Sequence, residues 1–196
     1  MKNYDIDKIL RPAFKLFLTN NYESVSTPKL EQESGMTRCA LFYKHKSKEE
    51  LFRAVVDRYI LDFLSNDIAV PANVTLKAYI AAFLNALLKR MENMQALGIE
   101  NVHRGFFNLM YEALKYYPNF DKQISLFFEN SLKRWTEVVQ QALESGEITS
   151  KSEAKDIAQW LQCLYTGMAF EQSLNKGLDF DMLRQAYNDY YKILTK

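Results

Sequence analysis

The fold of this chain is decided by residues 26–51, which read STPKLEQESGMTRCALFYKHKSKEEL. The first three residues predict a helix start, because Thr27 can cap the free amides there and Pro28 needs no amide donor at a first helical position. Gly35 can take the positive φ of a tight turn, and Thr37 offers a cap for the next helix. Two short helices joined through a glycine indicate a helix-turn-helix.

Further residues extend this pattern over about the first quarter of the chain. Apolar residues repeat at helical spacing from Ile9 to Leu18, and Asn20-Asn21 then breaks the helix. The pattern as a whole comprises Phe14-x-x-Phe17, Tyr22, Leu30, Ser34-Gly35-Met36-Thr37, Leu41-Phe42 and Ser47-Lys48-Glu49-Glu50-Leu51. In order and spacing it resembles the amino-terminal DNA-binding domain of TetR-family transcriptional regulators. The resemblance implies an all-α fold of about nine helices, with a three-helix helix-turn-helix domain before a helical bundle that binds an effector and dimerises.

Five positions depart from the family pattern. Asn21 stands where the family usually has glycine, and we expect the turn to be kept because asparagine tolerates left-handed geometry. Glu31 replaces a small alanine, so its helix should pack less closely or turn the glutamate outward. Phe42 replaces a tyrosine whose hydroxyl reaches a phosphate, Lys44 replaces a histidine, and His45 replaces a phenylalanine that packs inward. We therefore expect the domain to fold with rearranged phosphate contacts.

Charge is concentrated locally. The net charge of +1 does not by itself suggest DNA binding. Between Arg38 and Lys48, however, four cations occur with no acid among them, which suits a phosphate-facing patch. Taken alone, such a patch would be an ordinary solvated helix end, but its position on the helix-turn-helix favours DNA binding.

A recognition helix fits the major groove and presents its amino-terminal side chains to the base edges. Arg38 is the best candidate for a base contact, because a guanidinium can bond both acceptors of guanine, and its alternative role is phosphate binding. Helix-start residues and lysines suit phosphates better, and a redox-sensing thiol at Cys39 is a remote alternative. The predicted DNA-binding residues are Thr27, Thr37, Arg38, Cys39, Ala40, Phe42, Tyr43, Lys44 and Lys48.

The rest of the chain is predicted to be helical. Helices are expected over residues 48–66, 74–94, 106–117, 121–145, 152–176 and 179–194, with a break at Pro71-Ala72-Asn73 and a looser passage from Gly98 to Gly105. We expect residues 1–47 to bind DNA and residues 48–196 to bind the effector and dimerise, with the helix over 48–66 linking the two. No apolar run approaches the ~20 residues of a membrane span, and neither a secretory segment nor a disulfide framework is evident. These features favour the cytoplasm.

The last two helices, over residues 152–176 and 179–194, form a predicted hairpin with Gly177 between them. The first carries a broad apolar face that includes Trp160 and the small Gly167. The resemblance implies that these helices pair with their copies in a homodimer, as a protein that grips two DNA half-sites requires. The alternative is that they complete the core of a monomer.

The resemblance also implies a pocket for a small, largely apolar effector. Its predicted lining comprises Phe83, His103, Phe106, Phe107, Met110, Tyr111, Phe127, Phe128, Trp135 and Tyr165. For any one aromatic residue a core position is the commoner case, and for His103 an exposed position is commoner than a polar anchor.

Two other classes of function were weighed. An enzyme is disfavoured, because two histidines and two distant cysteines supply neither a metal cluster nor an activated nucleophile, and no glycine-rich phosphate loop is present. We therefore expect no catalytic residue, metal or cofactor. The second class is a helical protein-interaction module that has lost specific DNA binding, suggested by Phe42, Lys44 and His45.

Overall fold

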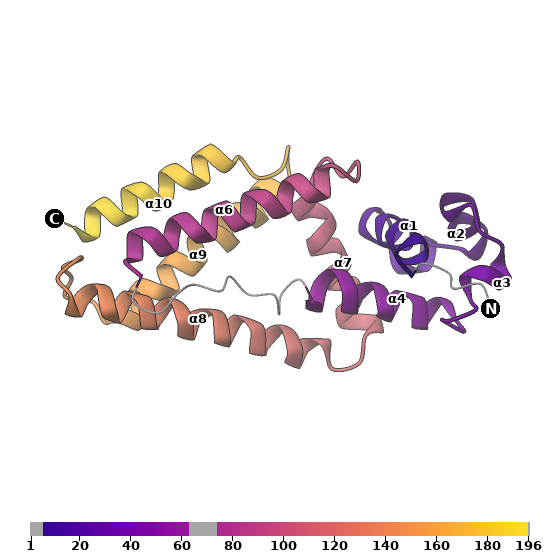
Figure 1. Cartoon of the computed structure of the whole chain (residues 1–196), viewed down its shortest axis with the longest axis horizontal. Helices are drawn as coiled ribbons and strands as arrows, with labels where there is room; N and C mark the ends of the chain where they lie inside the picture. Colours follow the sequence, from indigo (N-terminus) through magenta and orange to yellow (C-terminus); the bar gives the residue numbers. More distant parts are fainter. Residues whose placement is uncertain (1–5, 63–73, 196) are drawn as a thin grey trace. The chain divides into compact units, whose positions relative to one another are not determined.

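The computed structural model describes residues 6–62 and 74–195, and all regular structure in these two ranges is helical. Nine α-helices are present there, which confirms the predicted all-α fold. The chain packs as two compact units (Figure 1). Residues 1–66 and 105–123 form the first unit, and residues 67–104 and 124–196 form the second.

The first unit contains the predicted helix-turn-helix. Its elements are α1 (Ile6–Thr19), the 3-10 turn η1 (Tyr22–Ser24), α2 (Thr27–Ser34), α3 (Arg38–Leu41), α4 (Lys48–Val56) and the π-helical turn η2 (Asp57–Leu61). Its core is apolar and includes Phe14, Phe17 and Phe52, each at most 1% exposed. The helix predicted over 48–66 is thus present up to the π turn, and residues 63–66 lie outside the described part, as does the predicted break at 71–73.

Local caps explain where the short helices begin. Ser26, not Thr27, caps α2, because its Oγ accepts from the amide of Lys29 at 3.4 Å, and Thr27 is the first helical residue. Gly35 ends α2 with a φ of 66°, as predicted. The expectation of left-handed geometry at Asn21 is wrong: its φ is −64° and its backbone is extended, so no glycine-like conformation is needed there.

A reciprocal cap begins α4. Oγ of Ser47 accepts from the amide of Glu50 at 3.1 Å, and the Glu50 carboxylate accepts from the amide of Lys46 at 2.8 Å. Ser47 thus satisfies an amide that the first turn of a helix leaves without a partner, and Glu50 bonds the amide of the residue before the cap. The Ser-Lys-Glu-Glu sequence therefore has a local structural role, because its first and last residues form the cap of α4.

Helix α7 (Val102–Tyr116) contributes residues 105–116 to the first unit. The prediction that Gly105 lies in a loose passage is wrong, because it lies inside this helix, buried against Leu18. One face of α7 bonds the backbone after α1: Asn108 donates to the carbonyl of Asn20 at 3.4 Å, and the Glu112 carboxylate accepts from the amide of Tyr22 at 2.8 Å. Residues 105–116 therefore pack on the carboxyl end of α1.

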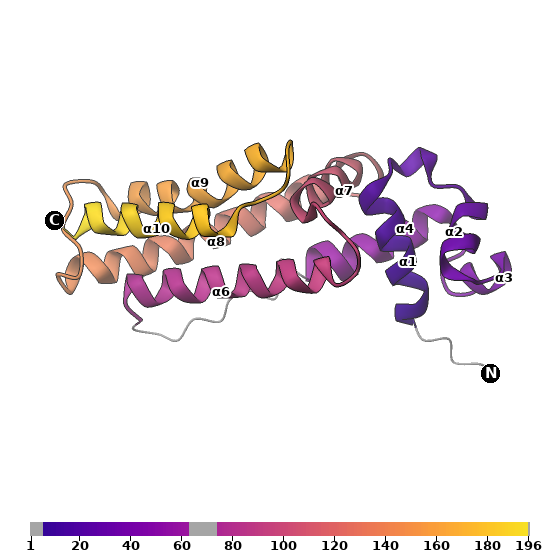
Figure 2. The same cartoon turned by 90° about the horizontal axis from the view of Figure 1, so that it is seen from above.

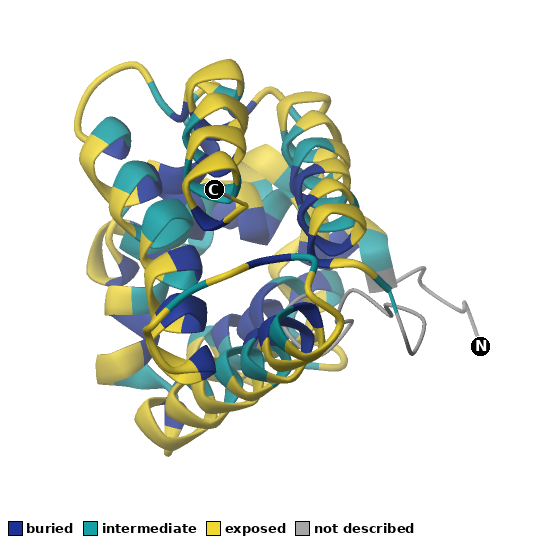
Figure 3. Cartoon of the chain, turned by 90° about the vertical axis from the view of Figure 1, so that its left-hand side faces the viewer, coloured by how far each residue is buried: buried dark blue, intermediate teal, exposed yellow. Residues whose placement is uncertain are grey.

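The second unit is a helical bundle. It consists of α6 (Leu76–Gln95), most of α8 (Phe120–Glu144), α9 (Ala154–Ser173) and α10 (Phe180–Leu194). Figure 2 shows α9 and α10 running antiparallel, as the predicted hairpin requires. Buried residues face the interior and exposed residues face outward (Figure 3). Trp135 and Tyr187, at most 2% exposed, are the largest side chains of this core.

Substitution of Gly105 by alanine is expected to destabilise the protein. A methyl group there would lie 2.5 Å from Cγ of Leu18, and overpacking of this kind costs about 1–3 kcal/mol. Urea unfolding of Gly105→Ala and of Gly105→Ala with Leu18→Ala measures the effect. The added methyl should cost less in the Leu18→Ala background; equal costs would show that the two side chains do not compete for space.

Candidate nucleic-acid interface

Five of the nine predicted DNA-binding residues lie together in the first unit. Thr27, Arg38, Cys39, Phe42 and Lys48 line one open depression of about 580 Å³. Lys46 and Ser47 complete its lining, although sequence reasoning did not place them among the contact residues. The depression thus combines three cations with the first residue of α2 and the first two residues of the short helix α3, a composition that suits a nucleic-acid backbone.

Two side chains hold the start of α3. Oγ1 of Thr37 accepts from the amide of Ala40 at 3.4 Å, which confirms the predicted cap. Oε1 of Glu31 accepts from the amide of Arg38 at 2.7 Å. The glutamate therefore does not simply point outward from α2, and its contact with a residue seven positions later has no periodic signal in the sequence.

The side chain of Arg38 is available for an external partner. Arg38 is exposed, and among the described residues its guanidinium has neither a hydrogen bond nor an ion pair with the protein. Its backbone, in contrast, is fixed by Glu31. An exposed donor group on a backbone held by a hydrogen bond is the arrangement expected of a residue that reads a base edge.

Lys48 has a structural role in addition to any role in DNA binding. Its Nζ donates to the backbone carbonyl oxygen of Tyr22 at 3.1 Å and lies 4.1 Å from the centroid of the Tyr22 ring. The ammonium group is therefore held in place by the turn after α1. It keeps further donors that face the depression.

The residues after Leu41 lie in a turn, since α3 ends there. Phe42 is half-buried, whereas Tyr43, 60% exposed, and Lys44 face solvent. His45 is also half-buried, and its buried Nε2 has no hydrogen-bond partner in the described part of the protein. Burial lowers the pKa of His45, so the neutral imidazole occupies the place of the family's apolar ring.

The ten predicted effector-binding residues are divided between the two units. Phe106, Phe107, Met110 and Tyr111 belong to the first unit, where Phe106 packs edge-on against Phe14 and Tyr111 is 57% exposed. The other six belong to the second unit. Phe127 and Phe128 contact each other on α8, with Phe128 40% exposed.

Four of the six form one aromatic cluster in the second unit. The ring centroid of Phe83 lies 5.3 Å from that of Trp135 and 5.7 Å from that of Tyr165. The hydroxyl of Tyr165 lies 3.1 Å from Nε2 of His103. The cluster thus joins a core residue, Trp135, to a polar pair.

His103 is not the exposed histidine that was expected to be the commoner case. It is 8% exposed, and its Nδ1 has no partner among the described residues. Burial lowers its pKa to about 4, because the low-polarity surroundings disfavour the charged imidazolium. His103 is therefore a buried neutral group with one unused ring nitrogen.

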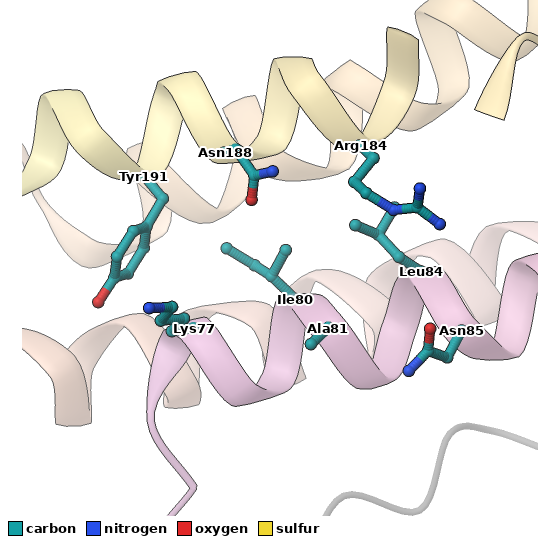
Figure 4. A pocket seen from close by; sticks show the side chains of 8 residues that line it. All are labelled: Lys77, Ile80, Ala81, Leu84, Asn85, Arg184, Asn188 and Tyr191. Carbon is teal, nitrogen blue, oxygen red and sulfur yellow. The ribbon is translucent and has the colours of Figure 1, made fainter. Parts of the chain in front are cut away.

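A separate groove lies between α6 and α10 (Figure 4). Ile80, Ala81 and Leu84 contribute its apolar part, and Lys77, Asn85, Arg184, Asn188 and Tyr191 supply polar groups. None of the predicted effector-binding residues lines it. Within the described ranges, no three histidines, cysteines or acids are grouped to hold a metal ion, and no helix there is long and apolar enough to cross a membrane.

Acidification is expected to weaken the fold through His103. The pKa of this side chain is 6.5 in the unfolded chain and about 4 in the folded protein. Its stabilising contribution is therefore fully present above about pH 6.5 and falls by up to about 3 kcal/mol as the pH approaches 4. Urea unfolding at several pH values measures this loss. The difference between wild type and His103→Gln should vary across this pH range; a constant difference would contradict the prediction.

Comparison with known proteins agrees with this geometry. Residues 9–55 match the model of bacterial regulatory proteins of the tetR family. The chain is 27% identical over 190 residues to the HTH-type transcriptional repressor ComR of Escherichia coli (strain K12), across 94% of this chain and 86% of that protein.

Solved structures share the fold at lower identity. A TetR transcription regulator from Haloarcula marismortui ATCC 43049 matches with a TM-score of 0.71 and 17% identity, over 96% of each chain. The reduced form of E. coli NemR matches with a TM-score of 0.67 and 14% identity, also over 96% of each chain. With its helix-turn-helix and its helical bundle, this chain is thus similar to TetR-family transcriptional regulators, most specifically over residues 9–55.

Proposed function

We propose that the protein is a repressor that binds a palindromic operator as a homodimer and is released by a small, largely apolar effector. Residues 1–47 would read DNA, and residues 48–196 would bind the effector and dimerise. The observation that carries the DNA-binding part is the depression around α3, where Arg38, Lys46 and Lys48 surround the start of the recognition helix. The related E. coli protein is described as a repressor, which supports repression over activation as the proposed mode of regulation.

The contacts divide by chemistry. Arg38 is assigned to a guanine edge in the major groove, with Thr37, Cys39, Ala40 and Tyr43 beside it. Thr27, Lys44 and Lys48 are assigned to phosphates, which position the protein without reading sequence. Phe42 is half-buried and lacks a hydroxyl, so its contribution is apolar contact.

Effector binding is assigned to the aromatic cluster of the second unit. Phe83 and Tyr165 are half-buried and offer apolar surface, and the unused Nδ1 of His103 offers one polar contact. Trp135 supports these side chains from the core. Phe127, Phe128 and the four residues of α7 in the first unit remain further candidates. Coupling of about 1–3 kcal/mol between effector and DNA would change DNA affinity some 5- to 150-fold.

Dimerisation is assigned to the outer face of α9 and α10. Trp160, Cys163, Gly167, Phe170 and Leu174 recur every three or four residues along α9 and its end, and all five are exposed. Trp160 is 65% exposed and Leu174 70%. Apolar side chains in a continuous stripe favour a helical partner, and the glycine permits its close approach. Met182 and Ile193 add exposed apolar surface on α10.

A protein-interaction module that has lost specific DNA binding is the alternative. Selection from a random duplex pool at moderate salt, without added ligand, separates the two. A recovered palindrome supports the repressor. If no sequence is recovered above background, the selection is repeated with cell extract, which would supply a missing effector. Failure in both selections supports the interaction module.

Replacement of Arg38 by alanine is expected to abolish specific binding to the selected operator and leave the dimer folded. The lost guanine contact is worth about 1–3 kcal/mol of discrimination. Lys44→Ala, at another exposed cation, should instead weaken binding to all sequences and reduce the slope of log affinity against log salt by about 1.8, because the homodimer loses two phosphate contacts. Fluorescence anisotropy over a salt series measures both. Unchanged operator binding by Arg38→Ala would refute its assigned role.

A charge in the exposed α9 stripe is expected to separate the protomers. Trp160→Glu should give a folded monomer, because a carboxylate buried against an apolar partner loses its hydration. Leu114→Glu changes an apolar side chain that is 50% exposed in the first unit and should leave the dimer intact. Sedimentation velocity at several concentrations measures the association. A wild-type monomer, or an intact Trp160→Glu dimer, would contradict the assignment.

A further inference from the structure

Glu31 occupies a place where it can affect how the recognition helix reads DNA. It lies in α2, and its Oε1 accepts from the amide of Arg38, the first residue of α3, at 2.7 Å. Glu31 is half-buried, and the described residues give it no cation partner in an ion pair. Its carboxylate therefore bonds the backbone of the recognition helix and does not neutralise a neighbouring side chain.

Helix α3 depends on such a bond because it is only four residues long. The first amides of any helix have no partner within the helix. In α3 the amides of Ala40 and Leu41 bond the Thr37 carbonyl at 2.9 and 3.0 Å, which leaves those of Arg38 and Cys39 without a backbone acceptor among the described residues. Thr37 supplies a long bond of 3.4 Å to Ala40, whereas Glu31 supplies a short one to Arg38. A hydrogen bond to an ionised acceptor is about twice as strong as a neutral one. Glu31 thus supplies the stronger of the two side-chain bonds at this helix start.

The bond also changes what DNA meets at this point. Free amides at a helix start are good donors to a phosphate. In this protein the Arg38 amide is already used, so a phosphate cannot take it without displacing Glu31. The Arg38 backbone is therefore fixed by the protein itself, while its guanidinium stays available.

We propose that Glu31 is a positioning residue for sequence readout: its carboxylate fixes the amino end of α3, so that Arg38 is presented to one base pair. The inference rests on the proposed DNA-binding function. It also implies a cost, since a negative charge beside the DNA repels phosphates and lowers affinity for every sequence. Specificity is thus gained at some expense in total affinity.

Two variants separate the bond from the charge. Glu31→Gln keeps an oxygen acceptor and removes the charge, whereas Glu31→Ala removes both. Glu33→Ala removes a similar charge from the same helix and leaves the Arg38 amide bonded, which makes it the matched control. Its ion pair with Lys15 is exposed and therefore of small energetic value.

The binding test measures affinities for the selected operator and for operators with a single base pair changed at each position. Glu31→Ala should lose roughly tenfold discrimination at one base pair of each half-site, the pair assigned to Arg38, and little elsewhere. Glu31→Gln should keep that discrimination and bind all sequences more tightly, as Glu33→Ala should. Unchanged discrimination in Glu31→Ala, or an equal loss at every position, would overturn the proposal.

A second readout does not require an operator. The Arg38 amide proton, observed by NMR in the free protein, should lie downfield in the wild type and move upfield in Glu31→Ala but not in Glu33→Ala. The same resonance in wild type and Glu31→Ala would overturn the proposal. If the wild type selects no operator, the proposed function fails, and the amide resonance still decides whether Glu31 holds α3.

Discussion

Backbone amides that no helix can satisfy internally are the constraint on which this structure depends. Four glutamates meet it by accepting from amides outside their own helical turn. Glu50 bonds Lys46 at the start of α4, and Glu31 bonds Arg38 at the start of α3. The other two act over longer distances in sequence: Glu112 on the amide of Tyr22, and Glu147 on the amides of Leu76 and Lys77 at the start of α6. Short helices can hold a defined orientation because these bonds fix their ends.

The two units rely on different forces. The second unit buries a continuous apolar core around Trp135 and Tyr187 and draws its stability mainly from packing. The first unit has an aromatic core of its own, but α2 and α3 contribute little to it, with Leu30 and Leu41 as their only fully buried residues. The part proposed to contact DNA is therefore held more by hydrogen bonds than by burial. Charge changes near it can alter its shape as well as its attraction to phosphates.

Helix α7 has hydrogen-bonded side chains near both of its ends. Its residues from Gly105 onward bond the backbone that follows α1, while His103 in its first turn pairs with Tyr165 in the aromatic cluster.

The sequence alone determined the elements that have local causes. The cap at Thr37, the positive φ at Gly35 and the Ser47–Glu50 pair are all set by residues within a few positions of one another, and helical periodicity located the longer helices. Only the tertiary structure decided that Glu31 caps α3, that Lys48 holds Tyr22, that Gly105 is a close contact and that His103 is buried. These contacts join residues between 7 and about 90 positions apart, and local spacing carries no information about them. The physical reason is that caps and periodicity act through neighbouring backbone, whereas burial and long-range bonds depend on how separate helices pack.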